Sequence, residues 1–145
     1  MPVLEIIKYP HEILRANCDS VEFPMTETIE GFCQDLKDTC TFHKALGLAA
    51  PQIGGDLRIF VFNTEEIIIN PIIIAGSSKI WSEESCLSIP NASFRVRRYA
   101  EITVAYYNKD GKITNDRVLT GLESIVFQHE YDHLKGILIR DKEIK

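Results

Sequence analysis

The chain has 145 residues, of which 45% are hydrophobic and 26% are charged, and its formal net charge is −5. This length is typical of a single domain, here residues 1–145, that buries about two thirds of its unfolded surface in one core. The negative charge excludes a general attraction to nucleic acid or to anionic membranes.

The N-terminal segment and the cysteines indicate the compartment. Charges interrupt the apolar residues of 1–8, which therefore lack the apolar core of a signal peptide. No apolar run approaches the length of a membrane span. The four cysteines form no Cys-x-x-Cys pair, which favours free thiols over disulfides. We therefore expect a cytoplasmic monomer that binds neither membranes nor nucleic acid.

The N-terminal part of the chain contains one clear helix pattern. Thr26 is a suitable N-cap, and apolar residues recur after it at helical spacing, which predicts a helix over residues 26–43. The next stretch, 46–55, is punctuated by glycine and proline and predicts a loop. This loop is poor in polar turn residues, so we do not expect it to be a solvated connector.

Apolar runs rich in β-branched residues follow. They predict strands over residues 57–62, 67–74, 95–107 and 112–118. Asp110-Gly111 is a strong hairpin turn between the last two strands. Asn70-Pro71 interrupts the second run, so that strand is expected to bend or to lie at a sheet edge.

A second helix is predicted over residues 121–134, with Gly136 well placed to end it. Because its histidines continue an apolar stripe, they are expected to point into the protein. A short strand over 137–140 closes the chain. This order predicts an α+β fold, in which antiparallel strands pack around the central histidine-bearing helix and the other helix lies nearer the N-terminus. The residues that share the apolar face are Leu122, Ile125, Val126, His129 and His133.

The segment 128–133 contains the pattern His-Glu-x-x-His. Two histidines four apart on a helix reach a single divalent metal, and the glutamate between them can take a proton from water. The same pattern arises by chance on surface helices, but two imidazoles on a buried face need partners that offset their desolvation. We therefore expect His129 and His133 to bind metal, with Glu130 as the base.

A catalytic metal site usually has three protein ligands and one open position. After His133, only Asp141 and Glu143 could supply the third ligand, as in zincin-like endopeptidases. Upstream, Cys86 stands alone between small polar residues in an expected loop, 82–90. A thiolate beside two imidazoles suits zinc or ferrous iron. The residue types favour the cysteine and leave the tail as an alternative.

Three segments together resemble the signature motifs of peptide deformylases, in the family's order and approximate spacing. The resemblance implies a metal-dependent hydrolase that removes the N-formyl group from the formyl-methionine of nascent polypeptides and releases formate. The segments are Gly47-Leu48-Ala49-Ala50-Pro51-Gln52, Glu84-Ser85-Cys86-Leu87-Ser88 and Gln128-His129-Glu130-Tyr131-Asp132-His133.

The resemblance assigns roles to particular residues. It implies one divalent metal, natively Fe²⁺, with Zn²⁺, Ni²⁺ or Co²⁺ as substitutes. Glu130 then serves as base and acid, while Gln52 and the Leu87 backbone N–H face the developing oxyanion. The implied metal ligands are Cys86, His129 and His133.

The resemblance also implies where a peptide binds. Leu46, Gly47 and Ser85 match positions whose backbone pairs with an extended peptide in the family. Val126, on the histidine face, is expected to help line the pocket for the methionine side chain. An ion pair between Glu84 and Arg98 is expected to brace the cysteine segment, so that charge reversal of Arg98 weakens metal retention.

The chain departs from the family pattern at three places. Ala45 replaces a glycine of the first motif. Ser85 replaces the glycine before the metal cysteine, which adds strain only if that backbone needs a positive φ. The sequence ends soon after Arg140, where many bacterial relatives continue into a long helix associated with ribosome docking, so we do not expect such docking.

Two alternatives follow from these observations. One is the zincin-like endopeptidase, and the other is a deformylase-like binding protein with little turnover, which the change at Ser85 allows. Short forms also resemble organellar and phage-encoded members, for which an organellar matrix or a host cytoplasm is the location.

Overall fold

The computed structural model describes residues 3–143, which contain two α-helices and five strands. The helices are α1 (Glu27–Phe42) and α2 (Gly121–His133), and the strands are β1 (Gly47–Ala49), β2 (Ile59–Phe62), β3 (Glu66–Cys86), β4 (Ile89–Tyr107) and β5 (Ile113–Thr120). Short 3₁₀ helices lie at Glu12–Arg15, Ala50–Ile53 and Ile139–Lys142.

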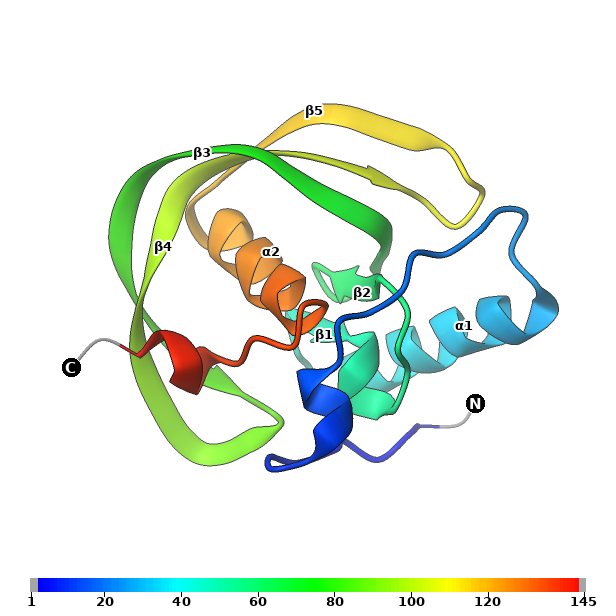
Figure 1. Cartoon of the computed structure of the whole chain (residues 1–145), viewed down its shortest axis with the longest axis horizontal. Coiled ribbons are helices and arrows are strands. Elements are labelled where there is room, and N and C mark those ends of the chain that lie inside the picture. The colour runs from blue at the N-terminus through cyan, green and yellow to red at the C-terminus, as the bar shows by residue number, and fades with distance from the viewer. Residues whose placement is uncertain (1–2, 144–145) are drawn as a thin grey trace.

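The strands form one antiparallel sheet in the order β1-β2-β3-β4-β5. The long hairpin of β3 and β4 arcs around α2, and α1 lies beyond the short strands β1 and β2 (Figure 1). This arrangement is α+β with α2 as the central helix, which confirms the predicted fold class. None of the described helices is long and apolar enough to span a membrane.

Strand alternation explains why β2 lies between the two helices. Successive side chains of a strand point to opposite faces. Ile59 and Val61 pack in the same core cluster as Leu36 of α1. Phe60 and Phe62 point the other way and meet Phe127 of α2, with ring centroids 5.0 and 5.6 Å apart in edge-on geometry. The four consecutive buried residues of β2 therefore bind both helices to the sheet.

The predicted helix over 26–43 corresponds to α1. The Thr26 side chain accepts a hydrogen bond from the Ile29 N–H, 3.2 Å away, as expected of an N-cap. The hairpin turn at Asp110-Gly111 is also confirmed, because β4 and β5 pair across it and Gly111 has a φ of 80°.

The loop predicted over 46–55 is wrong. It contains β1, whose Gly47 pairs with Phe62 of β2, followed by the 3₁₀ helix Ala50–Ile53. Leu48 and Ala49 are fully buried. A three-residue strand that is completed by a partner distant in sequence has no periodicity of its own.

The strand predicted over 67–74 is much longer, because β3 continues to residue 86. Its second half is polar and mostly exposed, and it is held by pairing with β4. Cys86 therefore ends a strand, and the prediction of a loop over 82–90 is wrong. The register shifts between Ile69 and Ile72, which confirms the bend at Asn70-Pro71, but β3 is not an edge strand.

The strand predicted over 137–140 is also wrong. This part of the chain turns into the 3₁₀ helix Ile139–Lys142. Asp141 caps the turn by accepting a hydrogen bond from the Leu138 N–H, and it forms an ion pair with Arg15.

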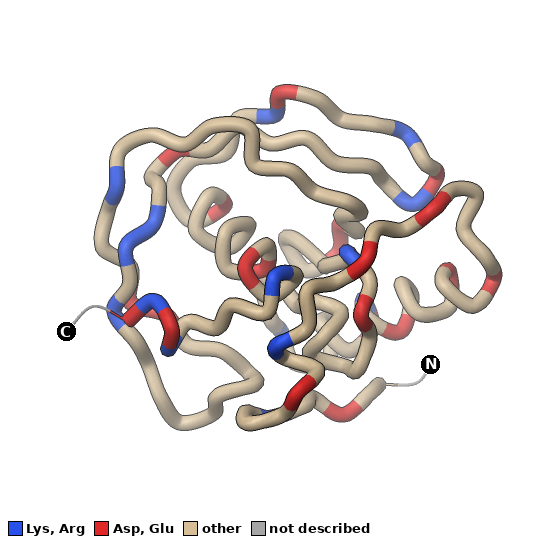
Figure 2. The backbone as a smooth tube through the Cα atoms, in the orientation of Figure 1, with Lys and Arg blue, Asp and Glu red and all other residues tan. Residues whose placement is uncertain are grey.

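Several Lys and Arg residues lie along the β3–β4 hairpin (Figure 2). Arg95 and Arg97 lie over the Trp81 ring, 4.1 and 5.0 Å from its centre. Arg98, on the opposite face of β4, is only 1% exposed. Because side chains alternate along a strand, Arg95 and Arg97 lie on the surface and Arg98 lies in the interior.

Candidate active site

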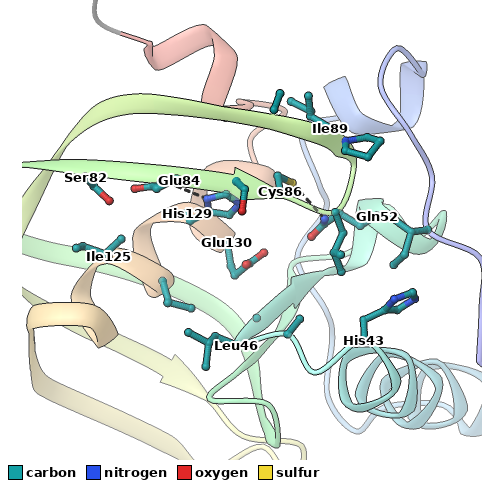
Figure 3. A pocket seen from close by; sticks show the side chains of 18 of the residues that line it. His43, Leu46, Gln52, Ser82, Glu84, Cys86, Ile89, Ile125, His129 and Glu130 are labelled. Atoms are coloured by element: carbon teal, nitrogen blue, oxygen red, sulfur yellow. Dashed lines mark hydrogen bonds and ion pairs between the residues drawn. The ribbon is translucent and has the colours of Figure 1, made fainter.

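A cavity of about 690 Å³ lies between α2, β1 and the end of the β3–β4 hairpin. Cys86 and Gln52 lie along one side of it, His129 and Glu130 project from α2, and Leu46 lies across the cavity from Cys86 (Figure 3). The three segments with signature motifs therefore meet at one place, although they are far apart in sequence.

One donor atom from each of Cys86, His129 and His133 lies within 4.8 Å of the other two. The Cys86 Sγ is 3.4 Å from the His133 Nε2. The end of β3 supplies the sulfur and one face of α2 supplies both imidazoles, so the two elements bring soft and borderline donors together. The number and kind of donors fit zinc or ferrous iron with a coordination position to spare.

The orientation of His129 is set by Glu84. Its Nδ1 lies 2.9 Å from the Glu84 Oε1, so the ring donates there and leaves Nε2 as the free donor. Arg98 holds the same carboxylate through two bonds of 2.9 and 2.7 Å, which confirms the expected Glu84–Arg98 ion pair. A second acid, Asp132, accepts from the Arg98 Nη1 at 2.6 Å.

These buried charges keep one another ionised. Burial alone would raise the pKa of Glu84, but the hydrogen bonds from Arg98 and His129 outweigh it and hold that pKa well below its ordinary value. Burial alone would lower the pKa of Arg98, and its two carboxylate partners raise it instead. The group carries its charges into the interior because each one is paired.

The two histidines respond differently to the same surroundings. Burial would lower the pKa of His129, but hydrogen bonds to Cys86 and Glu84 raise it to about 10. The pKa of His133 lies well below its ordinary value because of burial and the neighbouring positive charge of His129. The surroundings of His129 therefore favour positive charge at this point, and a bound metal would have to displace the ring proton because a ligating histidine is neutral.

Glu130 differs from Glu84 and Asp132, the other acids of the site, because its Oε1 is buried and has no hydrogen-bond partner among the described residues. Burial raises its pKa to about 7, although His129 and Arg98 act to lower it. A carboxyl group of near-neutral pKa can both accept and return a proton. Gly47 makes room for it, because a Cβ built there would lie 2.8 Å from the Glu130 Oε2.

Gln52 is held with its amide nitrogen toward the candidate metal ligands. Its Oε1 accepts from the Ala49 N–H at 2.9 Å, and its Nε2 lies 3.5 Å from the Cys86 Sγ and 3.2 Å from the Ser88 Oγ. Leu87, the residue after the cysteine, lines the same cavity. The amide is thus a neutral donor directed at the place where the three ligand atoms converge.

The apolar face of α2 lines the cavity, and of its residues Val126 also packs against the core. Leu122 is 62% exposed, and it lines the cavity together with Ile125, Val126 and His129. The helix packs into the core through Phe127, on its other side. Both histidines point into the protein as predicted, since His133 is 1% exposed and the His129 side chain is 11% exposed.

The remaining positions named by the resemblance also lie at the cavity. Leu46, Gly47 and Ser85 line it. Ser85 is part of β3 and does not have a positive φ, so the serine adds no backbone strain there. Asp132 and Ser88 were not singled out by sequence reasoning, although both lie inside the signature segments that could have identified them.

The other three thiols do not take part. Burial raises the pKa of Cys18 and Cys33 to about 11 and that of Cys40 to about 12. They remain protonated and act as small core side chains. All four cysteines are free, as the sequence predicts.

Comparison with known proteins agrees with this geometry. The model of the polypeptide deformylase family matches residues 3–145. The peptide deformylase of Aquifex aeolicus is 36% identical over 97% of this chain and 87% of its own length, and that of Halothermothrix orenii is 37% identical over 100% and 96%.

Solved structures give the same answer. The crystal structure of peptide deformylase from Thermotoga maritima has a TM-score of 0.93 at 31% identity and covers 100% of both chains. A Met-Ala-Ser-bound peptide deformylase from Acinetobacter baumannii has a TM-score of 0.90 at 25% identity and covers 97% of this chain and 98% of its own. The chain therefore belongs to the peptide deformylase family.

Proposed function

We propose that this protein is a metal-dependent hydrolase that removes the formyl group from the N-terminal formyl-methionine of nascent polypeptides and releases formate. The observation that carries the proposal is the convergence of Cys86, His129 and His133 beside Glu130, whose Oε1 has no hydrogen-bond partner within residues 3–143. We further propose Fe²⁺ as the native metal, with Zn²⁺, Ni²⁺ or Co²⁺ as substitutes, because one thiolate and two imidazoles suit this group of ions.

The chain's own residues divide the chemistry between them. When bound, the metal supplies a Lewis acid for activating water and polarising the formyl carbonyl. Glu130 takes a proton from the water that attacks the formyl carbon. Gln52 and the Leu87 N–H donate hydrogen bonds to the developing oxyanion. As the carbon–nitrogen bond breaks, Glu130 returns the proton to the leaving amine, so that formate and a free N-terminus result.

The cavity suits a peptide that begins with an apolar side chain. Val126 and Ile125 give it an apolar wall beside His129, where we place the methionine. Leu46, Gly47 and Ser85 border the same space, and we propose that their backbone pairs with the extended peptide. The Acinetobacter baumannii relative is a Met-Ala-Ser-bound structure, which supports a tripeptide of this kind as the ligand.

A zincin-like endopeptidase would need a third metal ligand from the C-terminal tail. Asp141 is engaged by Arg15 and by the Leu138 N–H, and it is not among the converging donors. Buried free thiols suit a reducing compartment, and we propose the cytoplasm as the place of action.

The test is an assay of the Fe²⁺-loaded protein under low oxygen with formyl-Met-Ala-Ser and with Met-Ala-Ser. We expect one formate for each free amine formed from the first peptide, with its peptide bonds intact, and no reaction of the second. Adding a chelator should abolish formate release. Cleavage between residues would support an endopeptidase, and binding without turnover would support a binding protein; either result contradicts the proposal.

A further inference from the structure

The turn between β2 and β3 has an unusual conformation. Asn63 and Thr64 both have positive φ, 53° and 70°. Asparagine tolerates this region, but a β-branched residue such as threonine is rarely found there. Glycine is the usual choice at positive φ in a tight hairpin turn. A residue in such a conformation persists only where its surroundings hold it, and it often marks a functional position.

The contacts of Thr64 show what holds it. Its Oγ1 donates to the Ala45 carbonyl at 2.8 Å, and its backbone N–H donates to the Leu46 carbonyl at 3.1 Å. Ala45 and Leu46 both line the cavity and lead directly into Gly47 of β1. Thr64 itself does not line the cavity. It therefore reaches the cavity only through the backbone of this segment, Ala45–Gly47, which we call the rim.

The neighbouring residue of the turn reaches the opposite wall. The Asn63 Nδ2 donates to the Glu123 Oε2 at 2.8 Å, in the first turn of α2. The next turn of that helix carries Val126 into the cavity. The Asn63–Glu123 bond is exposed and therefore weak, whereas the Thr64 bond is partly buried. Of the two, the threonine hydroxyl is the stronger constraint on the cavity.

We propose that Thr64 is a positioning residue, which holds the rim in the conformation that receives the peptide. The proposal rests on the proposed function, in which the backbone of Leu46 and Gly47 pairs with the substrate. The hydroxyl is the group that matters, because a glycine would fit the turn without strain but would leave the Ala45 carbonyl without this partner. The hydrogen bond that fixes the rim thus offsets the free-energy cost of a threonine at positive φ.

The experiment compares Thr64→Val, Thr64→Gly and Thr64→Ser with the wild type, using formyl-Met-Ala-Ser. Valine and glycine both remove the hydroxyl, and glycine also removes the strain at φ. We expect about a fivefold increase in KM for both, the effect of losing one hydrogen bond that orders a binding segment. The kcat should change less than about twofold, because Glu130 and the metal ligands are not touched.

Thr64→Ser keeps the hydroxyl group, so this variant should have the wild-type KM. The matched control is Thr114→Val, at a half-buried threonine on β5 that does not line the cavity, and its KM should not change. The affinity for Met-Ala-Ser, measured by calorimetry, should weaken by the same factor in the valine and glycine variants. This measurement does not depend on turnover.

The outcomes separate the two proposals. A wild type that releases no formate contradicts the proposed function, and the Met-Ala-Ser affinities then still decide the role of Thr64. An active wild type with unchanged KM and affinity in the valine and glycine variants contradicts the role of Thr64 alone. A normal KM with glycine but not with valine would assign the effect to backbone strain, which also overturns it.

Discussion

At the residue scale, Glu130 and Glu84 show how the fold gives two carboxyl groups different properties. Both are buried at the same site. Glu84 is surrounded by Arg98 and His129, which fix it as an anion that orients a ring. Glu130 has one oxygen without any partner among the described residues, which leaves it free to exchange a proton. The partners of each group therefore decide whether it supports the site or reacts.

The first prediction concerns Glu130 itself. Glu130→Gln keeps the shape of the side chain but cannot take a proton, so kcat should fall about 10²–10⁴-fold, the usual contribution of general acid–base catalysis. Metal content, measured on the purified protein, should remain that of the wild type. Glu101→Gln, at an exposed position of β4, is the control and should change neither quantity. Retained turnover in Glu130→Gln would remove Glu130 from the mechanism.

The second prediction concerns the space beside Glu130. In Gly47→Ala the new methyl group would lie 2.8 Å from the Glu130 Oε2 and 2.9 Å from its Cγ, so the carboxyl group has to move. Because small displacements of a reacting group are costly, we expect kcat to fall by about 10²-fold. Circular dichroism should show an unchanged fold.

The matched control for this change is Gly31→Ala. Gly31 lies in α1, and a Cβ built there meets nothing within 4 Å. The same substitution should there leave activity unchanged and stabilise the protein by about 0.5–1 kcal/mol through helix propensity. Equal kinetics in the two variants would mean that Gly47 does not control the position of Glu130.

At the element scale, a strand and a helix that are far apart in the sequence meet at the site. The end of β3 brings Cys86 and Glu84, and α2 brings the histidines and Asp132. Arg98 of β4 bonds to an acid on each side, Glu84 on β3 and Asp132 on α2. It is therefore one of the buried connections that fix the helix against the hairpin, beside the bonds of Ser124 and Gln128 to Tyr99 of β4.

The third prediction follows from this connection. Arg98→Met removes the arginine partner of two buried carboxylates, of which Asp132 keeps its ion pair with Lys142 and Glu84 keeps its contact with His129. The loss should destabilise the fold by about 3 kcal/mol, the lower end of the range for breaking a buried ion pair. It also frees the carboxylate that orients His129, so the metal affinity should fall about 10–100-fold. Denaturant unfolding and competition with a metal chelator measure the two effects.

Arg95→Met is the control for this prediction. Arg95 lies on the outer face of the same strand, over Trp81, and its removal should change stability by less than about 0.5 kcal/mol. If both variants lose the same stability and keep the metal equally well, the buried network does not support the metal ligands.

The elements differ in how well the sequence predicts them. Both helices are predicted within one residue at each end, because a helix is formed by local contacts that leave a 3.6-residue period. The second half of β3 has no such pattern, since its polar residues are ordered by pairing with β4, and that long-range partner is not visible in a local window. The exposure of Leu122 on α2 has a related reason, since an apolar cavity wall and an apolar core face have the same periodicity.

The convergence of the three candidate metal donors was easier to predict than the fold around them. The donors Cys86, His129 and His133 belong to short segments whose chemistry restricts the residue types and their spacing, so they can be recognised without knowing the strands. Of the contacts that hold them, the Glu84–Arg98 ion pair was predicted, whereas others could not be. The bridge from Arg98 to Asp132 and the bond from Thr64 to Ala45 depend on how distant segments meet in three dimensions.

At the scale of the whole molecule, the long β3–β4 hairpin arcs around α2 (Figure 1), and the cavity lies beside this helix. The two elements that carry the metal donors are joined in the chain by β4 and β5, so they are close in space only in the folded state. A metal bound there stabilises the folded protein over the unfolded one, because the unfolded chain does not bring the three donors together.

The last prediction tests this linkage between metal and stability. A metal present at 100 times its dissociation constant adds about 2.7 kcal/mol to the free energy of unfolding. For a chain of this length, its removal by a chelator should lower the thermal unfolding midpoint by on the order of 8 °C. Calorimetry of the Fe²⁺-loaded and chelated protein gives the difference directly. The Cys86→Ala variant, which lacks the sulfur ligand, should respond much less to the chelator, and an equal response in both proteins would place the stabilising metal elsewhere.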